Sequence, residues 1–145
     1  MKPLLYAVAI MAIMLFASSC EETIRDGAWD PIELDKSHVN FPQEGGQNTV
    51  SALNYTRWWI SGAYDLDKGL GDNYEFYIYP TSSGGEETCT YDILDGGWFH
   101  IIVPDKGKSN TVIITVDAHD NTTPRQAVVQ MQCGNAFTKF SISQQ

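Results

Sequence analysis

The sequence is poor in basic residues. Nine Lys and Arg stand against eighteen Asp and Glu in 145 residues, which gives a formal net charge of −9. Sites that bind phosphate backbones need clustered cations, so we expect no nucleic-acid partner. The length suits one domain of ordinary size. An aromatic content of 12% is too high for a disordered chain.

Enzyme signatures are also missing. The chain contains no G-x-S-x-G, H-E-x-x-H or C-x-x-C motif and no glycine-rich loop of the kind that holds phosphate. His38, His100 and His119 fall on different predicted elements and lack the spacing of a nucleophile and its base. Nothing marks a pair of carboxylates for acid–base work. We therefore expect a protein that is not an enzyme and that uses no cofactor.

The chain has only one long hydrophobic run, at its N-terminus. Residues 4–16 are apolar throughout, follow Lys2, and precede three small residues and Cys20. Thirteen residues rise only about 20 Å as a helix, too little for a bilayer core of about 30 Å. This order is typical of a secretory signal peptide, and the closing cysteine resembles the lipobox of bacterial lipoproteins. The alternative is a buried N-terminal helix that precedes a cysteine by chance.

The lipobox resemblance implies a signal peptide over residues 1–19 and an acylated Cys20 that anchors the mature chain in a membrane. The acidic pair Glu21-Glu22 follows directly, and it resembles the signal that sends Bacteroidetes lipoproteins to the outer face of the outer membrane. We expect an outer-membrane, cell-surface location. If the pair is an ordinary solvated one, the periplasmic face remains open. A polar tether is expected over residues 20–35, before one domain over residues 36–145.

The remainder of the chain shows short β-rich runs separated by turn residues, and no persuasive helical stripe. Nine such runs with mostly short turns favour an antiparallel β-sandwich. Nearly all the prolines lie at run boundaries, as strands require. The predicted strands cover residues 38–41, 48–53, 57–60, 74–79, 88–94, 98–103, 111–116, 126–133 and 137–143.

Alternation along these strands separates a buried face from a solvated face. In residues 126–133, for example, apolar side chains alternate with glutamines. Neighbouring strand residues point to opposite faces, so Trp58 and Trp59 cannot both enter one core. Trp58 shares its phase with Ile60 and is the predicted core residue, together with Trp98. Trp59 is expected to lie outside that core.

Several short motifs follow one another from about Lys36 to Gln145. They are Phe41, Gly45-Gly46, Val50, Trp58-Trp59-Ile60, Gly97-Trp98-Phe99, residues 112–116, Asn121, Pro124-Arg125, Ala127 and Ile142-Ser143-Gln144. This ordered set resembles the BACON domain, whose name stands for Bacteroidetes-associated carbohydrate-binding often N-terminal. The resemblance implies an immunoglobulin-like β-sandwich, usually appended to larger secreted or surface proteins. It also implies carbohydrate or mucin binding, the role proposed for that family.

Two features depart from the family pattern. Residues 62–95 are much longer than the usual link between the two tryptophan motifs, and we expect a β-hairpin there, formed by residues 74–79 and 88–94. No catalytic domain follows, so we expect the BACON-like unit to be the whole exported protein. The predicted fold is an all-β, immunoglobulin-like antiparallel β-sandwich with an inserted β-hairpin.

The inserted hairpin carries the candidate ligand site. Tyr77 and Tyr79 share a phase on its first strand. Flat aromatic rings with polar edges suit sugars, whose C–H groups stack while their hydroxyl groups form hydrogen bonds. Tyr77, Tyr79 and Trp59 are therefore the candidate glycan platform. The favoured interpretation of the hairpin itself is that it folds over the sheet and that these rings form a second small core.

Two cysteines remain once Cys20 carries lipid. In an oxidising compartment, Cys89 and Cys133 either form a disulfide or stay separate as small buried hydrophobes. A bridge would pin the inserted hairpin to the sandwich. The sequence leaves both arrangements open, because it does not give the distance between the two Cα atoms.

Residues 65–73 combine oxygen-bearing side chains with glycines, as calcium loops do. The stretch lacks the residue pattern and the terminal Glu of an EF-hand loop. A solvated turn is the favoured interpretation, and we expect no metal site.

Two classes of function fit these observations. The first is a non-catalytic, lipid-anchored cell-surface binding module, with glycan as the leading ligand class. The second is a structural or accessory surface lipoprotein that binds another protein or acts as a spacer. The aromatic hairpin and the family resemblance favour the first class, and the missing enzyme domain favours the second. We expect the first.

Overall fold

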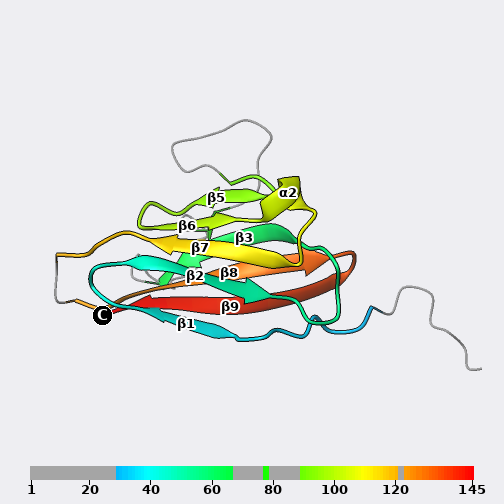
Figure 1. The fold of residues 1–145 in the computed structure, drawn as a ribbon, viewed down its shortest axis with the longest axis horizontal. Coiled ribbons are helices and arrows are strands. Elements are labelled where there is room, and N and C mark those ends of the chain that lie inside the picture. Colours follow the sequence, from blue (N-terminus) through cyan, green and yellow to red (C-terminus); the bar gives the residue numbers. More distant parts are fainter. Residues whose placement is uncertain (1–28, 67–76, 79–88, 121–122) are drawn as a thin grey trace, which may run out of the picture.

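The computed structural model describes residues 29–66, 77–78, 89–120 and 123–145. Over these ranges the chain forms two β-sheets that pack face to face (Figure 1). No helix in the described part has the length and apolar character needed to cross a bilayer. The elements are β1 (His38–Phe41), β2 (Gly46–Ser51), β3 (Trp59–Asp65), β4 (Tyr77–Ile78), β5 (Ile93–Asp95), β6 (Phe99–Ile102), α2 (Pro104–Gly107), β7 (Thr111–Val116), β8 (Arg125–Cys133) and β9 (Ala136–Gln144).

The strand order identifies the architecture. One sheet has the order β1-β9-β8-β3-β4, and the other has the order β2-β7-β6-β5. The trios β9-β8-β3 and β2-β7-β6 follow the two facing sheets of an immunoglobulin domain. All strand pairs are antiparallel except β1 with β9, which is parallel. The predicted all-β, immunoglobulin-like sandwich is therefore confirmed, with one parallel pair in addition.

The parallel pair arises because the N-terminal segment contacts both sheets in turn. On the edge of β2, the backbone N–H of Asp35 donates to the carbonyl of Ser51 at 3.0 Å, and that of Leu53 donates to the carbonyl of Glu33 at 2.8 Å. The chain then enters the other sheet, where β1 lies beside β9. The segment before β1 thus closes one side of the sandwich.

Residues 29–35, which the sequence assigned to a tether, pack against the sandwich. Ile32 is buried in the core. The ring of Trp29 stacks on Tyr55 and lies so close to Gly134 that an added Cβ there would be 2.4 Å from it. Because these contacts fix the backbone from Trp29 onward, residues 29–35 belong to the domain.

Strand β3 extends further than its sequence pattern predicts. The predicted run ends at Ile60, whereas β3 continues to Asp65. The pairing of β3 with β8 shifts register between Ile60 and Gly62, which marks a bulge. The extra residue changes the phase of the strand, so Ala63 and Asp65 are buried. A bulge of this kind breaks the alternation on which the prediction depended.

The inserted hairpin requires a correction. β4 pairs with β3 in the five-stranded sheet, whereas β5 pairs with β6 in the four-stranded sheet. Leu94 of β5 is almost fully buried between the sheets. Burial of this leucine holds the second half of the insertion against β6 instead of β4. The insertion therefore adds an edge strand to each sheet.

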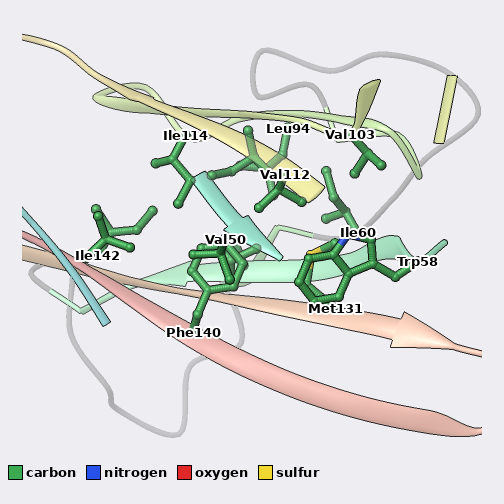
Figure 2. Close-up of a cluster of buried hydrophobic side chains, with 14 of the residues drawn as sticks. Val50, Trp58, Ile60, Leu94, Val103, Val112, Ile114, Met131, Phe140 and Ile142 are labelled. Carbon is green, nitrogen blue, oxygen red and sulfur yellow. The ribbon is translucent and has the colours of Figure 1, made fainter. Parts of the chain in front are cut away.

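The core fills the space between the two sheets (Figure 2). Trp58 is fully buried and Trp59 is half-buried, as their phases predicted. Within the described ranges, the indole N–H of Trp58 has no hydrogen-bond partner. Other fully buried side chains are Val50, Ile60, Ile101, Ile114, Met131 and Phe140.

Trp98 is not a core residue, contrary to the prediction. It is half-buried and packs against the margin of the core. Its indole nitrogen donates to Oδ2 of Asp65 at 2.9 Å, and the guanidinium of Arg125 lies 4.6 Å from the centre of its ring. A tryptophan with a polar edge needs such partners when it is partly buried, so Trp98 closes one end of the sandwich.

Candidate ligand-binding groove

Trp59 lies in an open groove at the end of the five-stranded sheet where β3 begins. The groove has a volume of about 610 Å³. It is built by β3, by the bend before β5, by α2 and by the end of β8, four segments that are distant in sequence. We call it the Trp59 groove; its lining residues are Trp59, Tyr91, Asp92, Lys106, Gly107 and Gln132.

The bend before β5 is fixed to both sheets by backbone hydrogen bonds. The N–H of Ile60 donates to the carbonyl of Tyr91 at 2.9 Å, and the N–H of Val103 donates to the carbonyl of Asp92 at 2.8 Å. The hydroxyl of Thr90 also donates to Oδ1 of Asp92 at 2.9 Å. The wall of the groove opposite Trp59 is therefore anchored, although the side chain of Tyr91 is 65% exposed.

The turn α2 presents Lys106 in an unusual backbone conformation. Asp105 and Lys106 both have a φ of 55°, and Gly107 has a φ of 80°. The N–H of Gly107 donates to the carbonyl of Val103 at 3.3 Å, which closes this left-handed turn. A left-handed conformation costs about 1–2 kcal/mol for each residue other than glycine. Strain of this kind is concentrated at functional sites in proteins.

Several polar groups of the groove have no partner. Among the described residues, nothing bonds to the indole N–H of Trp59, the hydroxyl of Tyr91 or the ammonium of Lys106. The carboxamide nitrogen of Gln132 donates to the carbonyl of Gly134 at 2.8 Å, which orients its oxygen as a free acceptor. The groove thus combines two aromatic rings with unused donors and acceptors, an arrangement that suits a hydroxyl-rich ligand.

Only one residue of the predicted glycan platform has a side chain that the structure describes. Trp59 lies in the groove, and Tyr79 lies outside the described residues. The backbone of Tyr77 pairs with Tyr64, five residues beyond Trp59 along β3. Five strand residues span roughly 15 Å. The aromatic neighbour that the structure gives to Trp59 is Tyr91.

Sequence reasoning missed Tyr91 because it treated residues 88–94 as one regular strand. In such a strand Cys89, Tyr91 and Ile93 would share a face. The chain instead bends at Tyr91, so Cys89 is buried while Tyr91 and Ile93 are exposed. The pairing of Thr90 with Asp92 is the kind of short polar contact that marks such a bend, and it offered the one local signal.

Cys89 and Cys133 are free in the structure, and both are buried. The backbone of Cys89 forms an isolated antiparallel β-bridge with Leu94, beside the four-stranded sheet. Cys133 is the last residue of β8, in the five-stranded sheet. Burial raises the pKa of the Cys89 thiol to about 11. Burial also raises the pKa of the Cys133 thiol, partly opposed by Arg57. Of the two arrangements left open by the sequence, the structure shows separate buried thiols instead of a disulfide.

The remaining candidate residues do not assemble into a metal centre in the described part. No three His, Cys, Asp or Glu side chains gather there as metal ligands. Most of the weak calcium pattern over residues 65–73 lies outside the description, and Asp65, its first acid, is buried beside Trp98 instead of being solvated. His38 lies on β1, His100 on β6 and His119 after β7.

A second hollow, of about 770 Å³, lies at the other end of β8 and β9. Its polar side chains bond to one another: Nε2 of His38 lies 2.8 Å from Oδ1 of Asn40, and the hydroxyl of Ser143 donates to the same oxygen. Polar atoms that bond to one another leave fewer hydrogen-bonding groups for a ligand. The lining residues are His38, Asn40, Pro42, Gln43, Glu44, Pro124, Gln126, Ser143, Gln144 and Gln145.

Comparison with known proteins gives one informative similarity. No family model and no curated protein matches the chain. The fold resembles a solved structure described as "NMR structure of the protein from Bacteroides thetaiotaomicron", with a TM-score of 0.58 and 25% identity. The alignment covers 86% of this chain and 95% of that one. The fold is shared with a Bacteroides protein.

Proposed function

We propose that this protein is a non-catalytic, lipid-anchored cell-surface module that binds glycan in the Trp59 groove. One observation carries the proposal: two aromatic rings and four unpartnered polar groups converge in one open groove. The polar groups belong to Trp59, Tyr91, Lys106 and Gln132. The resemblance to the BACON domain supports the same ligand class.

The groove supplies both kinds of contact that a sugar needs. The rings of Trp59 and Tyr91 offer apolar faces to the C–H groups of a pyranose. The indole N–H and the ammonium donate to hydroxyl groups, and the oxygen of Gln132 accepts from them. Since these groups are solvated and unpartnered, a ligand replaces water there without breaking protein hydrogen bonds.

The lipid anchor is the second part of the proposal. It is supported by the ordered signal segment that ends at Cys20. Eight residues separate Cys20 from Trp29. Eight residues span at most about 28 Å. Cys20→Ala should abolish labelling with radioactive palmitate and release the protein from membranes. A variant that stays labelled and membrane-bound contradicts the anchor.

Protein binding is the second candidate function, and one observation favours it. Ile93 and Ile102 are cross-strand partners on β5 and β6, and each is 46% exposed. Contiguous exposed apolar patches mark contacts with other proteins, and this pair would be the centre of such a patch. A protein that co-purifies with the chain from membranes, and no longer does so with the Ile102→Ser variant, would favour this function.

The glycan proposal is tested by presenting the purified protein at high density on beads to host and plant polysaccharides, since multivalency reveals weak sites. Each hit is then titrated by tryptophan fluorescence. Removal of a stacking ring should weaken binding about tenfold or more, so Trp59→Ala and Tyr91→Ala should each lose the hit. Leu53→Ala is the matched control, because this exposed side chain lies outside the groove. Absence of binding to every polysaccharide overturns the proposal.

A further inference from the structure

Phe137 lies in the same cross-strand row as Trp59. Gln132 of β8 is the Cα partner of Trp59 on one side and of Phe137 on the other. Directly opposite residues in a sheet project to the same face. Burial agrees with this placement. Both neighbours of Trp59 along β3 are buried, and so is Ala136 beside Phe137 on β9. The row therefore carries an aromatic ring, an amide and a second aromatic ring.

The exposure of Phe137 is unexplained by the fold. Its side chain is 53% exposed and is among the largest apolar side chains on the described surface. It has no polar atom that a solvated position would satisfy. Its neighbour Ala136 already fills the buried position at the start of β9. Packing thus gives no reason for a phenylalanine at this position, whereas a ligand that crosses the row does.

The spacing of the row matches a chain of linked sugars. Trp59 and Phe137 are two strands apart. Two interstrand spacings amount to about 10 Å. Pyranose rings on both aromatic side chains would therefore belong to one oligosaccharide, with a further ring or linkage above Gln132. The carboxamide of Gln132 is held by Gly134 and keeps its oxygen free between the two rings.

We propose that Phe137 forms a second stacking subsite, so that the protein binds an extended stretch of polysaccharide that runs across β3, β8 and β9. This inference rests on the proposed glycan site and specifies its ligand as a chain of several sugars. Tyr91 and Lys106 contact one end of the bound stretch, and Phe137 contacts the other. The chain lies on the open face of the sheet and continues past both ends.

The test is a chain-length series measured by calorimetry on the full protein. The probes are β-1,4-linked oligosaccharides of glucose, mannose, xylose and N-acetylglucosamine, with one to six sugar units. We expect affinity to rise with length until the row is covered. Phe137→Ala should weaken binding of the longest bound oligosaccharides about tenfold and leave the shortest bound ones unchanged. Phe137→Trp, which keeps a stacking ring, should retain the length dependence.

The outcomes separate the two proposals. If Trp59→Ala abolishes binding while Phe137→Ala leaves every chain length unaffected, the extended site is wrong and the glycan site stands. If Phe137→Ala weakens long and short probes equally, the site holds a single sugar and the inference is also overturned. If no member of the series binds, the extended site is overturned, and the glycan site stands or falls by the polysaccharide panel. If Trp59→Ala has no effect on a probe that binds, both proposals fail. Thermal unfolding of Phe137→Ala, with Leu53→Ala as control, verifies that the variant folds.

Discussion

The two ends of the five-stranded sheet use similar residues for different purposes. Each end carries a half-buried tryptophan beside polar side chains, Trp98 at one end and Trp59 at the other. At the Trp98 end the indole N–H is bonded to Asp65 and the ring is covered by Arg125. At the Trp59 end, within the described part, the indole N–H has no partner. The partners of each residue, and not its type, decide its role.

Gln144 completes the closed end. This side chain is fully buried, and its amide nitrogen contacts the carbonyl groups of Pro42, Gln43 and Asp117 at 2.9, 3.2 and 2.9 Å. Its amide oxygen accepts from Nε of Arg125 at 2.8 Å. Every polar atom of the side chain is therefore used to join β9 to neighbouring loops. Satisfied networks of this kind fix a fold and leave little for a ligand.

The residues that resemble the BACON domain lie mostly at the closed end of the sandwich, and not in the Trp59 groove. Trp98, Arg125 and Gln144 belong to the motifs that resemble the BACON domain, and all three lie in the closed network. Tyr91 and Lys106, which line the open groove, belong to none of those motifs. The motifs therefore indicate the fold, and the ligand must be inferred from residues outside them, with Trp59 as the exception.

The largest expected effect separates the two adjacent tryptophans. Trp58→Ala should destabilise the domain by about 3–5 kcal/mol, because it empties a fully buried site. Trp59→Ala should cost much less, because that side chain lies outside the core and is partly exposed to solvent. Urea unfolding followed by circular dichroism measures both. Equal costs would show that Trp59 serves the core and not a groove.

The next effect tests the closed end. Gln144→Ala should destabilise the domain by roughly 2 kcal/mol, because it removes the hydrogen bonds of a buried amide to three carbonyl groups and to Nε of Arg125. The three carbonyl groups keep other donors in Gly45, His119 and Arg125. Gln145→Ala is the matched control, since this neighbour is exposed, and should change stability little. Glycan binding by folded Gln144→Ala should be retained. A variant that loses binding but keeps its stability would place the ligand at the closed end.

Sequence patterns predicted the fold better than the site, for a physical reason. Alternation depends on neighbouring residues, so it placed Trp58 inside and Trp59 outside and gave the bounds of β1 and β7 correctly. Turn signals are equally local and do not say which sheet a strand joins, so β4 and β5 were assigned to one hairpin. The groove depends on contacts between Trp59, Tyr91 and Lys106 that are distant in sequence. No local pattern encodes such contacts.

A smaller effect is expected from the buried thiol beneath the open end. The pKa of Cys89 is raised from 9.0 to about 11, because burial disfavours the thiolate. A raised pKa in the folded state means that stability is complete below pH 9 and falls as pH rises toward about 11. Urea unfolding between pH 8 and about 11 should show this loss, and Cys89→Ala should reduce it. An alkaline profile that is identical in the variant contradicts a buried, neutral thiol at this position.

The smallest effect concerns backbone strain in α2. Replacing the strained residue by glycine should raise the free energy of unfolding, whereas the same change at an unstrained surface residue should not. Lys106 has a φ of 55°, a conformation in which glycine avoids a cost of about 1–2 kcal/mol. Glycine loses about 0.5–1 kcal/mol through the greater freedom of the unfolded chain. Lys106→Gly should therefore stabilise the domain by about 0.5–1 kcal/mol while it weakens glycan binding. Lys108→Gly is the control, because Lys108 has a φ of −98° and gains nothing from glycine. If Lys106→Gly stabilises the protein and binding is unchanged, Lys106 is not part of the ligand site and the strain has no role in recognition.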